Sequence, residues 1–117
     1  MIMPRGPLPR LRRIALALPK ASEKASHGEP TFWVGTRMFA SFADAANHHG
    51  AGRHAVWCNA AHVTQDLLVR HDPRRYFVPA YVGRSGWIGV YLDGDSDWGV
   101  VSDRLAHAHA LATQRPP

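Results

Sequence analysis

Apolar residues repeat with the period of an α-helix near both ends of the chain. The first repeat places five of them on one helical face, Leu8, Leu11, Ile14, Ala15 and Leu18. The arginines between them lie mainly away from that face, and Pro19 ends the run. A second stripe follows Val101, Leu105 and Ala108 to about Ala112. The pattern predicts an amphipathic helix at each end of the chain.

The middle of the chain has the residue types and the shorter period of β-strands. Two β-favouring runs within residues 31–42 are joined by a turn at 35–37, which predicts a hairpin. Residues 44–53 lack an apolar repeat and contain two glycines, so we expect an exposed loop there. Strands are predicted over residues 54–58 and 86–92.

One helix is expected between these two strands. Asn59 can cap a helix over about 60–70, with Val63 and Leu67 on one face. Residues 76–78 suit a short edge strand. The main elements follow in the order α, β, β, β, α, β, α, which favours an α+β fold with an antiparallel sheet over a doubly wound one.

Length and composition predict one folded domain. The chain has 117 residues, of which 45% are hydrophobic, and we expect a domain over residues 8–113 with a flexible lead-in at 1–7 and a tail at 114–117. No run approaches the roughly 18 apolar residues that a membrane span needs, and Cys58 is the only cysteine. We expect a cytoplasmic protein without a disulfide, a standard signal peptide or a membrane span.

The positive charge is unevenly distributed along the chain. The formal net charge is +5, and residues 1–20 contain five basic and no acidic residues, so they account for all of it. A basic chain favours an anionic partner, although this distribution weakens that argument for the rest of the domain. Eight histidines add positive charge on acidification, so any anion binding should strengthen below about pH 6.5.

Two stretches of sequence carry a family resemblance. The first reads EKASHGEPTF at residues 23–32 and is followed by Val34 and Met38-Phe39-Ala40. The second comprises PAYVG at 79–83, GWIGV at 86–90, Leu92-Asp93 and Asp97-Trp98. On these motifs the chain, from about Leu8 to Leu111, closely resembles the MmcQ/YjbR family.

This resemblance implies a fold and a function. It implies a compact α+β domain of CyaY-like, or frataxin-like, architecture, and a DNA-binding protein with a double-wing arrangement. Arg37 stands where the family generally has lysine, which keeps the charge but changes its geometry. The final helix lacks the Ser-Tyr pair common in the family, so no role of that pair is carried over to this chain.

Ser26-His27-Gly28 is the most distinctive motif. A Ser-His dipeptide suggests a hydrolase, but neighbouring residues in an extended chain point to opposite faces, and no G-x-S-x-G elbow is present. We expect His27 to bond a backbone carbonyl in the turn that Gly28 permits, and contact with a ligand is the alternative. No pair of titratable groups is spaced to serve as acid and base, so a hydrolase or transferase ranks third among the candidate functions.

Metal or cofactor binding is not predicted. His107 and His109 lie on different sides of a helix, and His62 with Asp66 has no third ligand nearby. The first helix is basic, whereas an iron-binding ridge would be acidic. Cys58 lies in an apolar run and is interpreted as a small buried hydrophobe.

The sequence predicts a non-enzymatic DNA-binding module. Its expected contacts are basic groups for the phosphates and aromatic rings for stacking, namely Lys24, His27, Arg37, Arg53, Arg84, Trp87 and Tyr81. Trp57 and Trp98 are interpreted as core anchors, whereas Gly86 and Gly89 leave room beside Trp87 for another backbone or a ligand.

One binding alternative also remains open. In it, the chain binds a small anionic molecule or a peptide in a cleft near the Ser26-His27-Gly28 motif and Tyr81. The sequence does not indicate an oligomeric state or a nucleic-acid sequence preference.

Overall fold

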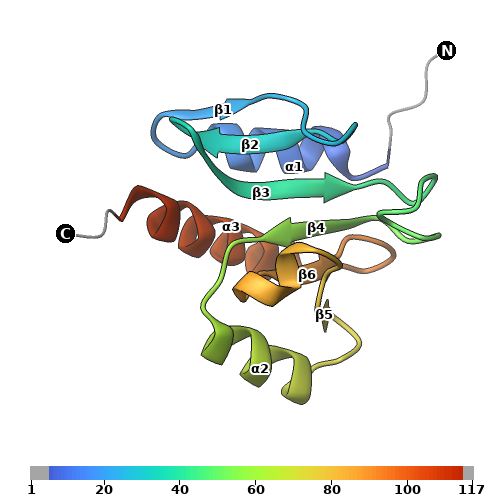
Figure 1. Ribbon diagram of the computed structural model, residues 1–117. Helices are drawn as coiled ribbons and strands as arrows, with labels where there is room; N and C mark the ends of the chain where they lie inside the picture. The colour runs from blue at the N-terminus through green and yellow to red at the C-terminus, as the bar shows by residue number, and fades with distance from the viewer. Residues whose placement is uncertain (1–5, 115–117) are drawn as a thin grey trace, which may run out of the picture.

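A six-stranded antiparallel sheet lies at the centre of the computed structural model, which describes residues 6–114 (Figure 1). The strand order is β1-β2-β3-β4-β6-β5, and every neighbouring pair is antiparallel. The strands are β1 Ala21–Glu23, β2 Thr31–Val34, β3 Arg37–Ala43, β4 Ala55–Cys58, β5 Tyr76–Phe77 and β6 Ile88–Tyr91. The helices are α1 Leu8–Leu16, α2 His62–His71 and α3 Trp98–Thr113, with a 3₁₀ helix, η1, at Val82–Ser85.

Helices α1 and α3 cover one face of this sheet (Figure 1). α3 packs on β2, β3 and β4, and α1 packs on α3 and β1. The main core lies between these helices and the sheet, and it includes the fully buried Leu11, Phe39 and Leu105. Asp97 caps α3 by accepting hydrogen bonds from backbone N–H groups of its first turn. The two amphipathic helices therefore bury their apolar stripes on the same side of the sheet.

The opposite face of the sheet carries a smaller apolar cluster and, within residues 6–114, no helix packed across it. Its buried members are Ala43, Ala55, Trp57 and Trp87. Side chains from several segments pack around them, among them Met38, Phe77, Val82 and Tyr91. Turns, a loop and large side chains therefore cover this face, whereas helices cover the other.

A β-bulge in β3 divides its side chains between the two faces. Phe32 pairs with Ala40 and Trp33 pairs with Met38, which leaves Phe39 between the two pairs. Phe39 and Ala40 are therefore both buried in the main core, although they are neighbours in sequence. Met38, before the bulge, belongs to the opposite face.

The predicted α+β class and the helices at both chain ends are confirmed. The predicted hairpin and the three later strands also form, as β2 with β3, and as β4, β5 and β6. Most of the predicted lead-in and tail, 1–7 and 114–117, lies outside the described residues. No helix within residues 6–114 is long and apolar enough to cross a membrane.

Two expectations about local structure are wrong. Strand β1 is absent from the predicted elements, because its sequence, Ala-Ser-Glu, has no β-favouring residues and forms a strand only by pairing with β2. Helix α2 begins at His62, without the predicted Asn59 cap. The two apolar residues expected on one face, Val63 and Leu67, are 65% and 50% exposed, because α2 packs at the β5 edge rather than across the sheet.

Gly86 and Gly89 differ in what fills the space beside them. A Cβ at Gly86 would meet the backbone around Ala60, with the Ala60 carbonyl oxygen only 2.8 Å away, as expected for a close approach of another backbone. The space beside Gly89 is filled by the ring of Phe77, so it is not open to a ligand.

We predict that Gly86→Ala destabilises the fold by about 2–4 kcal/mol, because it combines a strained positive φ with a backbone clash. Gly52→Ala is the matched control, since Gly52 has a similar φ, +98° against +95°, and open space around it. Urea denaturation of both variants checks this. Equal decreases in stability of the two variants would show that the nearby Ala60 backbone does not prevent a side chain at residue 86.

Cys58 is buried, with 1% of its surface exposed, which confirms its interpretation as a core residue. Burial raises the pKa of its thiol to about 12. We predict that the native protein does not react with a disulfide reagent at pH 8, because the thiolate is the reactive form. Unfolding in urea should release one fast-reacting thiol, and rapid modification without denaturant would contradict this burial.

Candidate ligand-binding pocket

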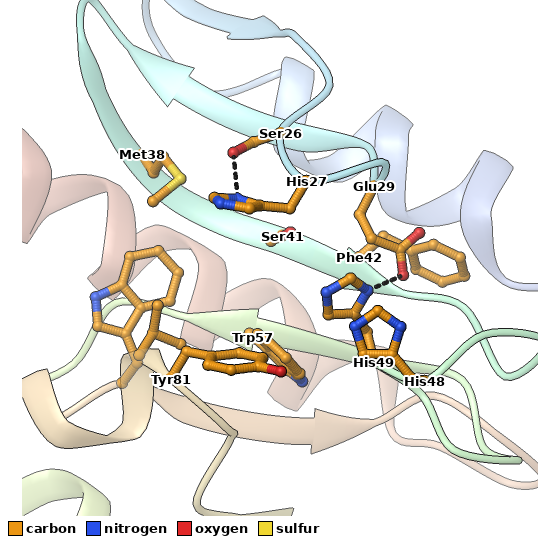
Figure 2. Close-up of a pocket in the computed structure, with 12 residues that line it drawn as sticks. Ser26, His27, Glu29, Met38, Ser41, Phe42, His48, His49, Trp57 and Tyr81 are labelled. Atoms are coloured by element: carbon orange, nitrogen blue, oxygen red, sulfur yellow. Dashed lines mark hydrogen bonds and ion pairs between the residues drawn. The ribbon is translucent and has the colours of Figure 1, made fainter.

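A pocket of about 580 Å³ opens on the sheet face that α1 and α3 leave uncovered (Figure 2). Its apolar wall consists of Met38, Phe42, Trp57, Tyr81, Val82 and Trp87. Its polar wall consists of Ser26, His27, Glu29, Ser41, His48 and His49. Figure 2 shows Ser26 and His27 on one side of the pocket and Trp57 and Tyr81 on the other. The volume is in the range of sites that hold a small organic molecule.

Ser26 and His27 are positioned by a tight turn before β2. The backbones of Ser26 and Glu29 exchange two hydrogen bonds, of 3.0 and 3.1 Å. The two residues between them, His27 and Gly28, both have positive φ, +54° and +81°, as in a type I′ turn. The predicted turn at Gly28 is therefore present, and His27 shares its left-handed conformation.

This turn corrects two expectations about His27. The Ser26 hydroxyl lies 3.1 Å from Nδ1 of His27, so the two side chains meet, although neighbours in an extended chain would not. The partner of His27 is this hydroxyl and not a backbone carbonyl. When the hydroxyl donates to Nδ1, the neutral ring carries its proton on Nε2, where it is free to be donated to a ligand. Among residues 6–114 no carboxylate accepts a hydrogen bond from the His27 ring.

Glu29 links this turn to the loop after β3. Its carboxylate is buried and accepts hydrogen bonds from the backbone N–H of Asp44, at 2.8 Å, and from the side-chain amide of Asn47, at 3.0 Å. Nδ1 of His49 lies 3.6 Å from the same carboxylate oxygen. A buried carboxylate needs such partners. Glu29 therefore holds the loop, and with it His49, against the pocket.

Two buried nitrogen atoms in the wall accept or donate no hydrogen bond within the described part of the chain. They are Nδ1 of His49 and Nε1 of Trp57. His49 still faces the Glu29 carboxylate, and its ring packs edge-on against Trp57 with centroids 5.6 Å apart. The indole N–H can only donate, so Nε1 of Trp57 is a buried donor without an acceptor among the described residues, on a residue that is 7% exposed.

Tyr81 has the most unusual backbone in the site. Its φ and ψ are 63° and −69°, and the N–H of Val82 donates to the carbonyl of Ala80 at 2.6 Å, which together define a γ-turn of the strained, positive-φ kind. The side chain is 71% exposed and borders the pocket. Strained residues of this kind are concentrated at functional sites.

Helix α2 fixes the segment that carries Tyr81 and Trp87. The side-chain amide of Gln65 donates to the carbonyls of Gly83 and Trp87, at 2.8 and 2.7 Å. The ring of His62 donates to the carbonyl of Arg84 at 2.9 Å. Although no residue of α2 is buried, the helix thus positions one wall of the pocket.

Of the seven residues predicted to bind nucleic acid, three line the pocket. They are His27, Tyr81 and Trp87, and Trp87 is also part of the buried apolar cluster. Lys24 and Arg84 are exposed, and each lies within three residues of a pocket residue in the sequence. The backbone carbonyl of Lys24 accepts a hydrogen bond from the indole N–H of Trp33.

The structure separates the other two arginines. Arg37 begins β3 and donates to the carbonyl of Gln114, after the end of α3. Arg53 precedes β4, whose first residue pairs with the last residue of β3, so Arg37 and Arg53 lie at opposite ends of β3. They therefore do not form one cluster.

Arg53 is already paired with an acid. It donates two hydrogen bonds to the carboxylate of Asp93, at 2.6 and 2.9 Å, and lies 3.4 Å above the ring of Tyr91. These hydrogen bonds raise the pKa of Arg53 and lower the pKa of Asp93. Its charge is therefore largely compensated within the chain.

Sequence reasoning missed Glu29, His48, His49 and Trp57 as parts of the site. Glu29 is visible in the sequence as an acid directly before a β-favouring run, but its partners lie 15 and 18 residues further along the chain. Within residues 6–114 no group of three or more His, Cys, Asp or Glu side chains is placed to hold a metal ion.

The chain is similar to known proteins over almost its whole length. The YjbR family model matches residues 16–111. The crystal structure of the Deinococcus radiodurans protein DR2400, with the domain DUF419, superposes with a TM-score of 0.77 at 19% identity, covering 98% of this chain and 84% of that one. No curated protein matches the chain. Because the family model covers most of the sequence, the chain belongs to the YjbR family.

Proposed function

We propose that this protein binds a small anionic organic molecule in the pocket and does not chemically change it. The observation that carries the proposal is the combination of an apolar, aromatic cavity with a lining histidine, His27, whose Nε2 has no hydrogen-bond partner among the described residues. A ligand with an acceptor group supplies what the wall lacks.

The hydrogen-bonding groups of the pocket favour a ligand with acceptor atoms, such as an organic anion. Its ionisable lining includes three histidines and one carboxylate, Glu29. The carboxylate is engaged by Asp44 and Asn47, whereas His27 has a ring nitrogen available for a ligand. The apolar wall favours an organic body over a simple inorganic ion.

We predict saturable binding of 2-naphthoate, with an affinity that changes less than about threefold between about 50 and 200 mM salt, because one ligand charge is buried in a pocket. Isothermal titration calorimetry measures the affinity for 2-naphthoate and for two further carboxylates, benzoate and octanoate. His27→Asn, which tolerates the positive φ, should weaken binding about fivefold because one hydrogen bond to the ligand is removed.

His107→Asn is the matched control, because His107 is exposed on α3, outside the pocket. Equal effects of the two histidine substitutions would argue against a site at the turn. No saturable binding of any of the three carboxylates would overturn the proposal.

DNA binding is the second candidate, and a specific observation supports it. Lys24, Arg37 and Arg84 are exposed, and none of them forms an ion pair within residues 6–114. Such cations are available for phosphates, unlike Arg53, which is held by Asp93.

For DNA the measured quantity is the slope of the logarithm of the binding constant against the logarithm of the salt concentration. We predict that the double variant Arg37→Ala with Arg84→Ala reduces the magnitude of this slope by about 0.9 for each phosphate that these arginines neutralise. Arg53→Ala should leave the slope nearly unchanged. Fluorescence anisotropy of labelled oligonucleotides, duplex and single-stranded, at about 50 and 200 mM salt measures this. A double variant that binds like the unmodified protein would exclude these two arginines, and absence of binding at low salt would exclude this candidate.

A further inference from the structure

Three histidines line the pocket, and they differ in what surrounds each ring. Nδ1 of His49 lies 3.6 Å from the carboxylate of Glu29, and the ring of His48 lies against that of His49, with centroids 4.0 Å apart. A positive charge on His49 is therefore compensated by Glu29 within the chain. His27 is exposed, and among the described residues its ring is hydrogen-bonded only to the hydroxyl of Ser26. A positive charge on His27 is therefore available to a ligand.

The Ser26 hydroxyl suits both protonation states of His27. Its oxygen lies 3.1 Å from Nδ1, and a hydroxyl can donate to an unprotonated nitrogen or accept from a protonated one. When the hydroxyl donates to the neutral ring, the single proton of that ring lies on Nε2. In the charged ring both nitrogens carry a proton. Because Ser26 can reverse its hydrogen bond, Nε2–H is a donor in either state. A backbone carbonyl at Nδ1 would instead leave Nε2 of the neutral ring an acceptor.

The formal charge of the pocket lining changes sign over the pH range in which histidines titrate. The titratable groups that share the pocket with His27 come from its own turn, from the loop after β3 and from the segment before η1, and they are Glu29, His48, His49 and Tyr81. Lys24 is exposed outside this lining. With neutral histidines the lining carries the one negative charge of Glu29, and with three protonated histidines its formal charge is +2. Acidification thus changes a pocket that repels an anion into one that attracts it.

We propose that the pocket binds its organic anion together with a proton, which His27 takes up, and that it releases the anion as the pH rises. The proton comes from the solvent and binds at Nδ1, where the Ser26 hydroxyl then accepts, while Nε2–H donates to the anionic group of the ligand. Ser26 is a positioning residue that keeps Nε2 a donor. This deepens the proposed function, names its regulation and rests on it.

The first test compares a charged ligand with an uncharged ligand of similar shape. 2-Naphthoate stays ionised between about pH 5.5 and 8, since carboxylic acids titrate near about pH 4, and 2-naphthamide carries no charge. In isothermal titration calorimetry 2-naphthoate should bind about tenfold more tightly at the lower pH, because a charge-assisted hydrogen bond replaces a neutral one. The affinity for 2-naphthamide should change less than about twofold. An equal lack of pH dependence for 2-naphthoate would overturn the proposal.

His27→Asn tests which of the three histidines is responsible. Asparagine tolerates the positive φ of residue 27 and does not titrate. The affinity of this variant for 2-naphthoate should change less than about twofold over the same pH range. His107→Asn, which alters a histidine outside the pocket lining, should keep the full pH dependence. Full pH dependence in His27→Asn would overturn the assignment to His27.

Calorimetry also measures the proton directly. The heat of 2-naphthoate binding at about pH 7 is compared in buffers that differ in their ionisation enthalpy. The unmodified protein should take up a net fraction of a proton for each ligand bound, and His27→Asn should take up none. No net uptake by the unmodified protein would contradict the coupling of anion and proton.

A spectroscopic measurement on the unmodified protein does not depend on whether a variant folds. The ¹⁵N signals of the ring nitrogens distinguish the two neutral tautomers of a histidine from its charged form. For His27 they should show the Nε2–H tautomer at about pH 8, and 2-naphthoate at about pH 7 should increase the charged form. A His27 ring that keeps its protonation state when the ligand binds would overturn the proposal.

Ser26→Ala tests the positioning role, because serine itself does not titrate. At about pH 8 the variant should mix the two neutral tautomers of His27 and bind 2-naphthoate about twofold more weakly, since half of the rings lack the Nε2 donor. At about pH 5.5 its affinity should equal that of the unmodified protein, because both ring nitrogens are protonated. Ser41→Ala is the matched control, since Ser41 lines the same pocket but its hydroxyl pairs with that of Thr31, and its effect should not depend on pH. An effect of Ser26→Ala that is equal at both pH values would overturn this role.

The outcomes separate this inference from the proposed function. If no carboxylate binds at any pH between about 5.5 and 8, both fail. If 2-naphthoate binds in the pocket with the same affinity at both ends of this range, anion binding stands and the uptake of a proton is wrong.

Discussion

Helices α1 and α3 pack on the same face of the six-stranded sheet, so its opposite face has to be covered by turns, one loop and large side chains. Such cover leaves a hollow more readily than a helix does, because segments of different lengths meet over the sheet without a common packing surface. The bulge in β3 adds to this by sending Phe39 and Ala40 together into the main core and leaving Met38 to the opposite face. The pocket lies on the face that these two helices leave uncovered.

Polar contacts hold two walls of the pocket in place, beside the apolar cluster that forms much of its lining. Buried Glu29 ties the turn at His27 to the loop after β3, and Gln65 on α2 holds the carbonyls of the segment that follows Tyr81. Both side chains satisfy groups of the backbone, which makes their geometry specific. The hollow is thus framed on two sides by hydrogen bonds, and Trp57 remains the donor on its wall without an acceptor among residues 6–114.

Charge is distributed differently around the molecule than along the sequence. Arg53 and Asp93 are 40 residues apart, yet they form a two-point ion pair under which the ring of Tyr91 lies. Both side chains are more than a third exposed, so the pair contributes only about 0.5–1 kcal/mol, but it removes Arg53 from the set of free cations. Arg12 is likewise paired with Glu23. Arg37 and Arg84 stay exposed but belong to different elements, because Arg37 begins β3 and Arg84 lies in η1.

The sequence by itself determined the features that depend on local order: the helical stripes at both ends, the hairpin from β2 to β3, the turn that Gly28 permits and the burial of Cys58 in an apolar strand. The order of its predicted elements also indicated the α+β class, and its motifs indicated the family. Only the tertiary structure decided the rest, because each remaining feature depends on partners that are distant along the chain or on one backbone conformation. Periodicity on α2 could not show that Val63 and Leu67 face outward, since this depends on where the sheet ends. Likewise the left-handed φ of His27 brings Ser26 to its ring, and the lack of an acceptor for Trp57 within the described chain becomes visible only when every neighbour of that side chain is in place.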